Sequence, residues 1–148
     1  MKLNVKIKKL NKNAKIPTYG SQSSAGADLY AYIDNEEGIT IEAGQTEFIH
    51  TGISIEFPDG YVALVYARSG LACKQGLAPA NKVGVVDSDY RGEIIVALHN
   101  HSSIPRKIKN GERIAQMVFT PYYTADFTLT DELSNTERGT GGFGSTGI

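Results

Sequence analysis

The feature that most constrains this chain is its series of short apolar runs, each ended by turn-forming residues. Alternating or continuous apolar segments recur at 3–10, 39–42, 46–57, 61–67, 93–99, 106–109, 113–120 and 126–130. Glycine, proline, asparagine and aspartate separate them, as in Pro58-Asp59-Gly60. Runs of this length and spacing favour strands. We therefore expect an all-β domain built as a jelly-roll-like sandwich or barrel.

Two local signals refine this expectation. Asn110-Gly111 lies between the runs 106–109 and 113–120. Asn-Gly is the strongest short hairpin signal, so it predicts that these two runs pair with each other. Ser69–Gln75 is the one helix candidate, two turns long at most.

Length and composition limit the class of protein. A chain of 148 residues fits one domain with a real core. Its net charge of −1 lacks the basic excess of a polyanion binder, although a few cationic groups suffice for a small phosphorylated ligand. The single cysteine, Cys73, suits a reducing compartment, and we expect it to be a small buried apolar residue. No signal peptide or membrane-length apolar run is visible, so we expect a cytoplasmic location.

The C-terminal residues RGTGGFGSTGI differ from the rest because five of them are glycines. Such a segment cannot order itself by apolar burial, so we expect a β domain over 1–137 and a flexible arm over 138–148. Arg138, Ser145 and Thr146 offer hydrogen-bond donors to a phosphate group, and Phe143 can pack on the ring of a ligand. A Walker loop is excluded because Ser145 stands where lysine is required. The alternative is a frayed, solvated terminus.

Four internal segments carry further polar groups. Arg68, Ser69 and Gly70 follow an apolar run and can form an anion site, or Ser69 can simply be a helix N-cap. In 81–95, two apolar arms flank the sequence Asp-Ser-Asp-Tyr-Arg-Gly, which predicts a β-hairpin with a water-activating carboxylate or, alternatively, a solvated turn. Gln116 interrupts an apolar strand and needs a hydrogen-bonding partner, and Asp28 lies at the start of an acidic strand.

The expected metal is Mg²⁺ rather than zinc. The histidines lack the spacing of zinc ligands. A phosphate group bound among acidic side chains instead requires Mg²⁺ and water.

Five segments, in order, resemble the five motifs of the trimeric dUTPase family. They read AGADLYA, ARSGLA, NKVGVVDSDYRGE, GERIAQMVF and RGTGGFGSTG, and the match runs from about residue 15 to the end. The resemblance implies a jelly-roll homotrimer whose active sites combine segments of different subunits. It also implies hydrolysis of dUTP to dUMP and pyrophosphate, which limits uracil incorporation into DNA and supplies dUMP for thymidylate synthesis. Mg²⁺ would be held by the substrate phosphates and water.

The resemblance also implies roles for individual residues. By this resemblance, Asp87 would be the general base that activates water. Tyr90 would be the aromatic ring that packs on deoxyribose and excludes a 2′-hydroxyl. The uracil-reading group would be the backbone of Gly84, Val85, Val86 and Ile95, with Asn81 nearby. The phosphate contacts would be Arg68, Ser69, Gly70 and Gln116, and the closing arm would use Arg138, Phe143, Gly144, Ser145 and Thr146. Asp28 would support the metal–water shell or a subunit contact.

Three other functions remain open from the sequence. A dCTP deaminase shares the fold, but its resemblance lacks the Asp-x-Asp-Tyr segment together with a phenylalanine-containing glycine-rich arm. A jelly-roll interaction module without turnover has no need of Arg68, Asp87 and Gln116 in register. A sensor that binds dUTP and signals to a partner can coexist with hydrolysis.

Overall fold

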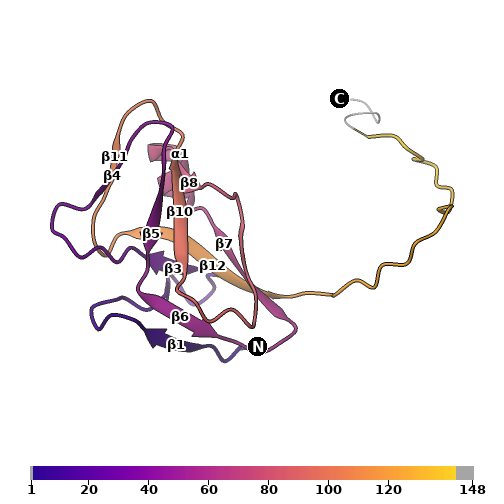
Figure 1. Ribbon diagram of the computed structural model, residues 1–148, viewed down its shortest axis with the longest axis horizontal. Coiled ribbons are helices and arrows are strands. Elements are labelled where there is room, and N and C mark those ends of the chain that lie inside the picture. The colour runs from indigo at the N-terminus through magenta and orange to yellow at the C-terminus, as the bar shows by residue number, and fades with distance from the viewer. Residues whose placement is uncertain (1, 143–148) are drawn as a thin grey trace.

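The computed structural model describes residues 2–142, which form an all-β domain with one short helix (Figure 1). The strands form sheets with the orders β1-β6, β5-β10-β8, β11-β4 and β2-β3-β12-β7-β9. Their bounds are β1 Lys6–Lys9, β2 Thr18–Tyr19, β3 Ala27–Tyr30, β4 Ile39–Ile41, β5 Thr46–His50, β6 Ile53–Glu56, β7 Tyr61–Tyr66, β8 Leu77–Pro79, β9 Gly84–Val86, β10 Ile95–Asn100, β11 Arg106–Ile108 and β12 Arg113–Pro121.

The five-stranded and three-stranded sheets share one hydrophobic core. β12 lies in the middle of the larger sheet and pairs antiparallel with both β3 and β7. Its buried Ile114 and Met117 belong to the same cluster as Ile49 of β5 and Leu98 of β10. Alternate residues of a strand point to opposite faces, so each sheet can turn one apolar face inward. This arrangement confirms the expected all-β, jelly-roll-like architecture.

The helix α1 spans Ser69–Gln75, as the sequence predicts. Its only buried residue is Leu71, which anchors it to the core. Gly76 ends the helix in the left-handed region at φ 71°, and its N–H bonds the carbonyl oxygens of Ala72 and Leu71. Glycine is favoured there because it has no Cβ to clash. No helix in residues 2–142 is long and apolar enough to cross a membrane.

Two expected strand arrangements are wrong. The run 46–57 is not one strand, because Gly52 adopts φ 68° and splits it into β5 and β6, which join different sheets. The runs around Asn110-Gly111 do not form a hairpin, since β11 pairs with β4 whereas β12 pairs with β3 and β7. Only Gly111 of this pair has positive φ, and the tight hairpin turn requires it at both residues.

Two smaller expectations also fail. Residues 126–130 form no strand in the described chain, because no neighbouring strand supplies them with a ladder partner. After β12 the backbone leaves the body of the domain and extends away from it (Figure 1). Cys73 is exposed on α1 rather than buried, since the helix turns Leu71 and not Cys73 toward the core.

Candidate active site

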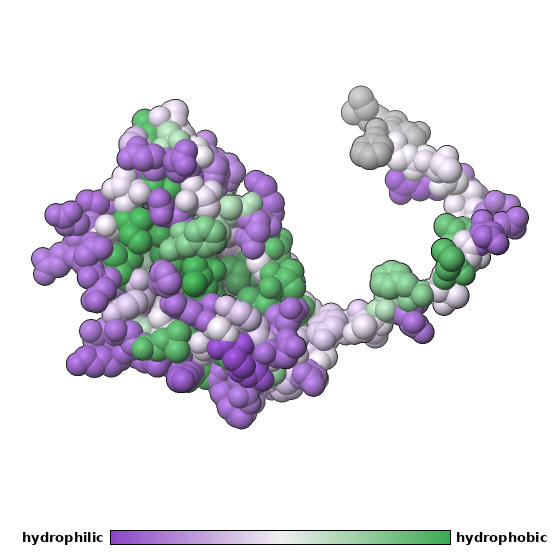
Figure 2. Space-filling model, viewed as in Figure 1, coloured by the Kyte–Doolittle hydropathy of each residue, from purple (hydrophilic) through white to green (hydrophobic). Residues whose placement is uncertain are grey.

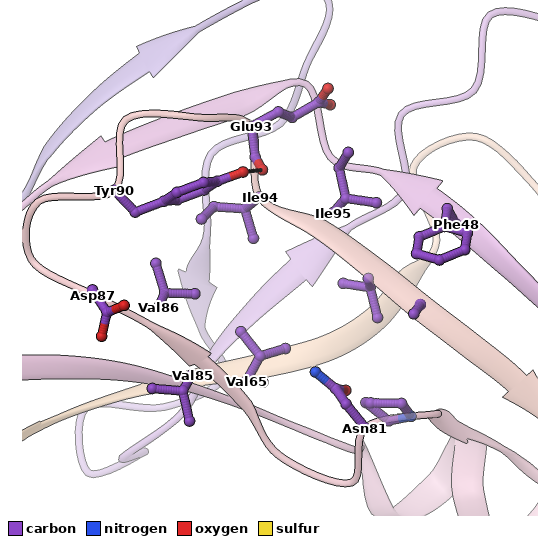
Figure 3. Close-up of a pocket in the computed structure, with 14 residues that line it drawn as sticks. Phe48, Val65, Asn81, Val85, Val86, Asp87, Tyr90, Glu93, Ile94 and Ile95 are labelled. Carbon is purple, nitrogen blue, oxygen red and sulfur yellow. Dashed lines mark hydrogen bonds between the residues drawn. The ribbon is translucent and has the colours of Figure 1, made fainter.

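A pocket of about 380 Å³ opens between β9, β10 and the loop that joins them (Figure 3). It is largely apolar, with Asn81 toward one end and Asp87 and Tyr90 toward the other. Figure 2 shows the apolar surface gathered in a hollow on this face of the domain. The residues that line the pocket are Phe48, Val65, Pro79, Asn81, Gly84, Val85, Val86, Asp87, Tyr90, Glu93, Ile94, Ile95, Val96 and Ala97.

The pocket exists because β9 and β10 do not pair with each other. β9 is the edge strand of the five-stranded sheet, whereas β10 lies in the three-stranded sheet. The predicted β-hairpin over 81–95 is therefore wrong, and its two arms diverge into separate sheets. Among residues 2–142, β9 has a strand partner only on its β7 side, and β8 pairs only with Leu98, His99 and Asn100 of β10. Gly84–Val86 pair with β7 and Ile95 pairs with His50 of β5. On the sides that face the gap, the backbone of β9 and of the start of β10 has no strand partner within residues 2–142 and can hydrogen-bond a flat polar ligand.

Tyr90 and Asp87 lie on the loop at one end of this gap. The Tyr90 N–H bonds the Asp87 carbonyl oxygen at 3.2 Å, which tightens the loop. The Tyr90 hydroxyl donates to the Glu93 carbonyl oxygen at 3.0 Å (Figure 3). Tyr90 is 45% exposed, so its ring can offer an apolar surface to a ligand. No side chain within residues 2–142 bonds the exposed Asp87 carboxylate, which leaves its oxygens able to accept a proton from water.

Asn81 lies at the other end of the pocket, beside Gly84. A Cβ on Gly84 would lie 3.4 Å from Asn81 Nδ2 and 3.2 Å from the Cβ of Val65. Glycine at 84 therefore lets the amide pack closely against β9. Asn81 also leads into Lys82, which has the left-handed φ of 64° that turns the chain toward the strand.

A second polar cluster surrounds the end of β7 and involves Arg68. Arg68 Nε donates to Asp28 Oδ1 at 2.7 Å, and Arg113 Nη1 donates to Asp28 Oδ2 at 3.3 Å. Gln116 Nε2 donates to the carbonyl oxygen of Ala67 at 2.9 Å. A Cβ on Gly26 would collide with Gln116 Oε1, so glycine is needed for this packing. The cluster fixes the backbone from which Arg68 projects.

Ser69 and Gly70 follow Arg68 as the first two residues of α1, and both are exposed. Ser69 is not the N-cap: that position is Arg68, which has extended backbone and makes no side-chain cap hydrogen bond. The Ser69 hydroxyl is thus not engaged in capping the helix.

The pocket and the Arg68 cluster are separate within one chain. The β7–β9 register pairs Ala63 with Val86, so its continuation puts Asp87 opposite Val62 near the start of β7. Arg68 follows the opposite end of that strand, roughly 20 Å further along at about 3.3 Å per residue. The structure therefore brings together the residues expected to contact uracil and the sugar and the expected general base, Asp87. It does not bring the expected phosphate contacts to the same place; these are Arg68, Ser69, Gly70 and Gln116.

The expected arm residues are placed only in part. Arg138 lies on the extended C-terminal segment, where its Nε donates to the carbonyl oxygen of Gly141 at 2.9 Å. Phe143, Gly144, Ser145 and Thr146 lie outside the described residues.

Several residues of the pocket wall, notably Phe48 and Glu93, were not predicted from the sequence. Phe48 is 67% exposed and pairs with Ala97 across β5 and β10. A large exposed aromatic side chain in an otherwise regular strand is the signal that can find it. Glu93 carries no such signal, because an acidic residue after glycine is typical of any solvated turn.

Known proteins share the sequence pattern and the fold of this chain. The dUTPase family model matches residues 12–147. The deoxyuridine 5′-triphosphate nucleotidohydrolase of Desulfitobacterium hafniense (strain DSM 10664 / DCB-2) is 52% identical, over 100% of this chain and 97% of the relative. That of Nautilia profundicola is 48% identical, over 98% and 99%. The structure of the Staphylococcus bacteriophage 80alpha dUTPase with dUPNHPP superposes with a TM-score of 0.87 at 28% identity, covering 98% of this chain and 99% of that one. The chain belongs to the dUTPase family.

Proposed function

We propose that this protein hydrolyses dUTP to dUMP and pyrophosphate. The observation that carries the proposal is the pocket itself, which is lined by the exposed Tyr90 and by Asp87, whose carboxylate no side chain of residues 2–142 bonds. Such a pocket has the size of a small-molecule site and the few convergent polar groups that orient a ligand. Family membership supplies the reaction that these groups would perform.

The uracil base would lie between β9 and β10, with Asn81 at its far end. Backbone groups of Gly84, Val85, Val86 and Ile95 on the side facing the gap would read its polar edge. A base held between two backbone segments has little space for a 5-methyl group, and an exocyclic amino group would meet the wrong hydrogen-bonding partner. This arrangement would favour uracil over thymine and cytosine.

Tyr90 and Asp87 would act on the sugar and the phosphate. The Tyr90 ring would pack on deoxyribose and leave no space for a 2′-hydroxyl. Asp87 would accept a proton from a water molecule that attacks the α-phosphorus in line, with pyrophosphate leaving. Phosphoryl transfer depends mainly on positioning and charge neutralisation, so a single well-placed base suffices.

Arg68, Ser69, Gly70 and Gln116 would bind the triphosphate. The Asp28 carboxylate holds Arg68 through its Nε, and the terminal amino groups of that guanidinium would then be available to phosphate oxygens. Because Asp28 already bonds two arginines, we propose that it positions Arg68 and does not join the metal–water shell.

The family implies a divalent cation, and we propose Mg²⁺. Within residues 2–142 no three His, Cys, Asp or Glu side chains converge as a metal cage. That arrangement fits an ion carried by the substrate phosphates and water, since Mg²⁺ keeps most of its waters and prefers phosphate oxygens. When bound, it would neutralise charge on the triphosphate.

The separation of the pocket from the Arg68 cluster supports an active site shared between subunits. We propose the homotrimer that the resemblance implies. The extended segment after β12 supports assembly independently, because Tyr123, Phe127, Leu129 and Leu133 are almost fully exposed in the single chain. Large apolar side chains gathered on one extended segment are typical of a surface that another chain covers.

We further propose that residues 138–148 form an arm that closes over the bound nucleotide, attached to the β domain 1–137. Arg138, Ser145 and Thr146 would contact the γ-phosphate with Gly144, and Phe143 would stack on the uracil. A cytoplasmic location remains part of this proposal.

A pyrophosphate-release assay on dUTP, dTTP, dCTP and UTP, with and without Mg²⁺, tests the function. We expect rapid pyrophosphate release from dUTP alone, and strong dependence on the metal. Ammonia release from dCTP would instead indicate a deaminase. Absence of turnover on all four nucleotides would contradict the proposal.

A further inference from the structure

Glu93 is a pocket residue whose carboxylate is turned away from the ligand space and bonded on both oxygens. Oε1 accepts the Gly52 N–H at 2.7 Å, and Oε2 lies 2.8 Å from His50 Nδ1, which donates in its Nδ1–H tautomer. The side chain is only 20% exposed. A carboxylate engaged in this way is poorly placed to transfer protons but well placed to hold its own backbone still.

The backbone of Glu93 in turn holds Tyr90. The carbonyl oxygen of Glu93 is the acceptor for the Tyr90 hydroxyl at 3.0 Å, the contact drawn in Figure 3. Gly92 lies between the two residues, and a Cβ there would collide with the Tyr90 hydroxyl and ring. The ring therefore folds back over the loop, and its position depends on where the Glu93 carbonyl points.

The element that anchors Glu93 is the bend between β5 and β6. Gly52 has φ 68° there, and a Cβ would lie 2.7 Å from the Cβ of Ala14, so the bend is tightly packed. Next to it, the Ile94 N–H bonds the Ile53 carbonyl oxygen at 2.9 Å, and Thr51 Oγ1 donates to the Ile94 carbonyl oxygen. Glu93 and Ile94 are thus joined to a buried part of the scaffold.

We propose that Glu93 is a positioning residue for sugar selection: its carboxylate ties the loop to Gly52 and His50, and its carbonyl fixes the Tyr90 ring against the sugar position. The inference rests on the proposed dUTP hydrolysis, in which that ring excludes a 2′-hydroxyl. A loosened ring would make room for ribose, so Glu93 controls discrimination between dUTP and UTP more than the chemical step.

The test compares Glu93→Ala with Glu93→Gln in the full-length protein. Gln keeps an acceptor for the Gly52 N–H and an amide that can donate to His50, whereas Ala removes both contacts. One lost hydrogen bond corresponds to roughly two- to tenfold in an equilibrium, so we expect Glu93→Ala to lower the ratio of kcat/KM for dUTP to that for UTP by about that factor. Glu93→Gln should restore the ratio. In a Tyr90→Phe background, where the hydroxyl is absent, Glu93→Ala should change the ratio less than in the Tyr90 background.

His50→Ala provides a second variant if Glu93→Ala does not fold, because the His50 side chain is 54% exposed and its loss leaves the core intact. We expect the same change in ratio, smaller in size. If folded Glu93→Ala and His50→Ala both keep the unmodified ratio, or if the Tyr90→Phe background leaves the effect undiminished, the inference is wrong.

A readout independent of turnover separates this inference from the proposed function. In protein with ¹³C-labelled tyrosine, the Tyr90 ring resonance should shift or broaden in Glu93→Ala and return in Glu93→Gln. Absence of dUTP turnover in the unmodified protein would contradict the proposed function, whereas an unchanged Tyr90 resonance in Glu93→Ala would contradict the positioning role.

Discussion

Arg68 Nε donates a 2.7 Å hydrogen bond to Asp28 Oδ1, which joins the end of β7 to the start of β3 across the sheet. The Asp28 side chain is 13% exposed, and Arg113 bonds its second oxygen at 3.3 Å. Asp28, in the first motif, thus orients Arg68, in the second motif. Three residues that are far apart in the sequence thus form one ion-pair cluster.

Asp28→Asn should weaken substrate use without unfolding the protein. The amide keeps the shape of the carboxylate but loses the charge-assisted bond that orients Arg68, and such bonds are worth about 1.5–3 kcal/mol. We expect kcat/KM for dUTP to fall about tenfold or more, by steady-state kinetics. Arg113→Gln is the matched control, because its bond is longer and its side chain is 51% exposed; it should have a much smaller effect. Equal losses in both variants would speak against a specific role for Arg68.

Asp87→Asn should abolish most of the chemistry while preserving binding. A general base typically contributes about 10²–10⁴-fold to the rate, so kcat should fall by that range. Calorimetric titration with a non-hydrolysable dUTP analogue should give an affinity close to that of the unmodified protein. Asp89→Asn, two residues along the same loop, controls for a general charge effect. Near-normal turnover in Asp87→Asn would exclude Asp87 as the base.

Removal of residues 138–148 should leave a folded assembly that turns over dUTP poorly. Closing segments complete many active sites by excluding water and adding phosphate donors. We expect kcat/KM to drop at least about a hundredfold, since one lost donor to developing charge costs about 10²–10³. Thermal melting and sedimentation should be unchanged. Unfolding of the truncated chain would instead assign the segment a structural role.

Leu129→Asp should disrupt association between chains. Leu129 is 98% exposed in the single chain, and its burial in an assembly would contribute about 1.5–3 kcal/mol per chain. We expect sedimentation velocity to show smaller species at low concentration, with loss of activity because the active site would be shared. Thr128→Asp adds the same charge at the adjacent polar residue and should leave the assembly intact. An unchanged oligomer in Leu129→Asp would contradict the proposed packing of this segment.

Lys6→Met should raise the pKa of Glu56. The Lys6 ammonium bonds Glu56 Oε1 at 2.6 Å and holds the pKa of that carboxyl below its ordinary value of 4.5. A lowered folded-state pKa gives stability that is present above the unfolded value and is lost as pH falls through the folded one. The pair is exposed, so its contribution to the free energy of unfolding is small. Carboxyl NMR titration should show the change in Glu56, with Lys8→Met as the control.

Local signals in the sequence determined the features that depend on neighbouring residues. Ser69–Gln75 forms a helix and Gly76 ends it, because a left-handed C-cap needs only a glycine at the right place. Most strands were likewise found as apolar runs. Among the candidate site residues, Asp87 and Tyr90 were identified because they share one short loop, and the family motifs gave each a role.

Strand pairing was decided only by the tertiary structure. Asn110-Gly111 marks a turn, yet β11 and β12 leave it for different sheets, and the arms of 81–95 diverge in the same way. The partners β4, β3, β7 and β5 are distant in sequence, and a ladder is stabilised by whichever distant strand completes the shared core. That divergence opens the pocket, separates Asp87 from Arg68 and turns Glu93 toward the Gly52 bend, because non-local packing rather than local propensity sets where each strand lies.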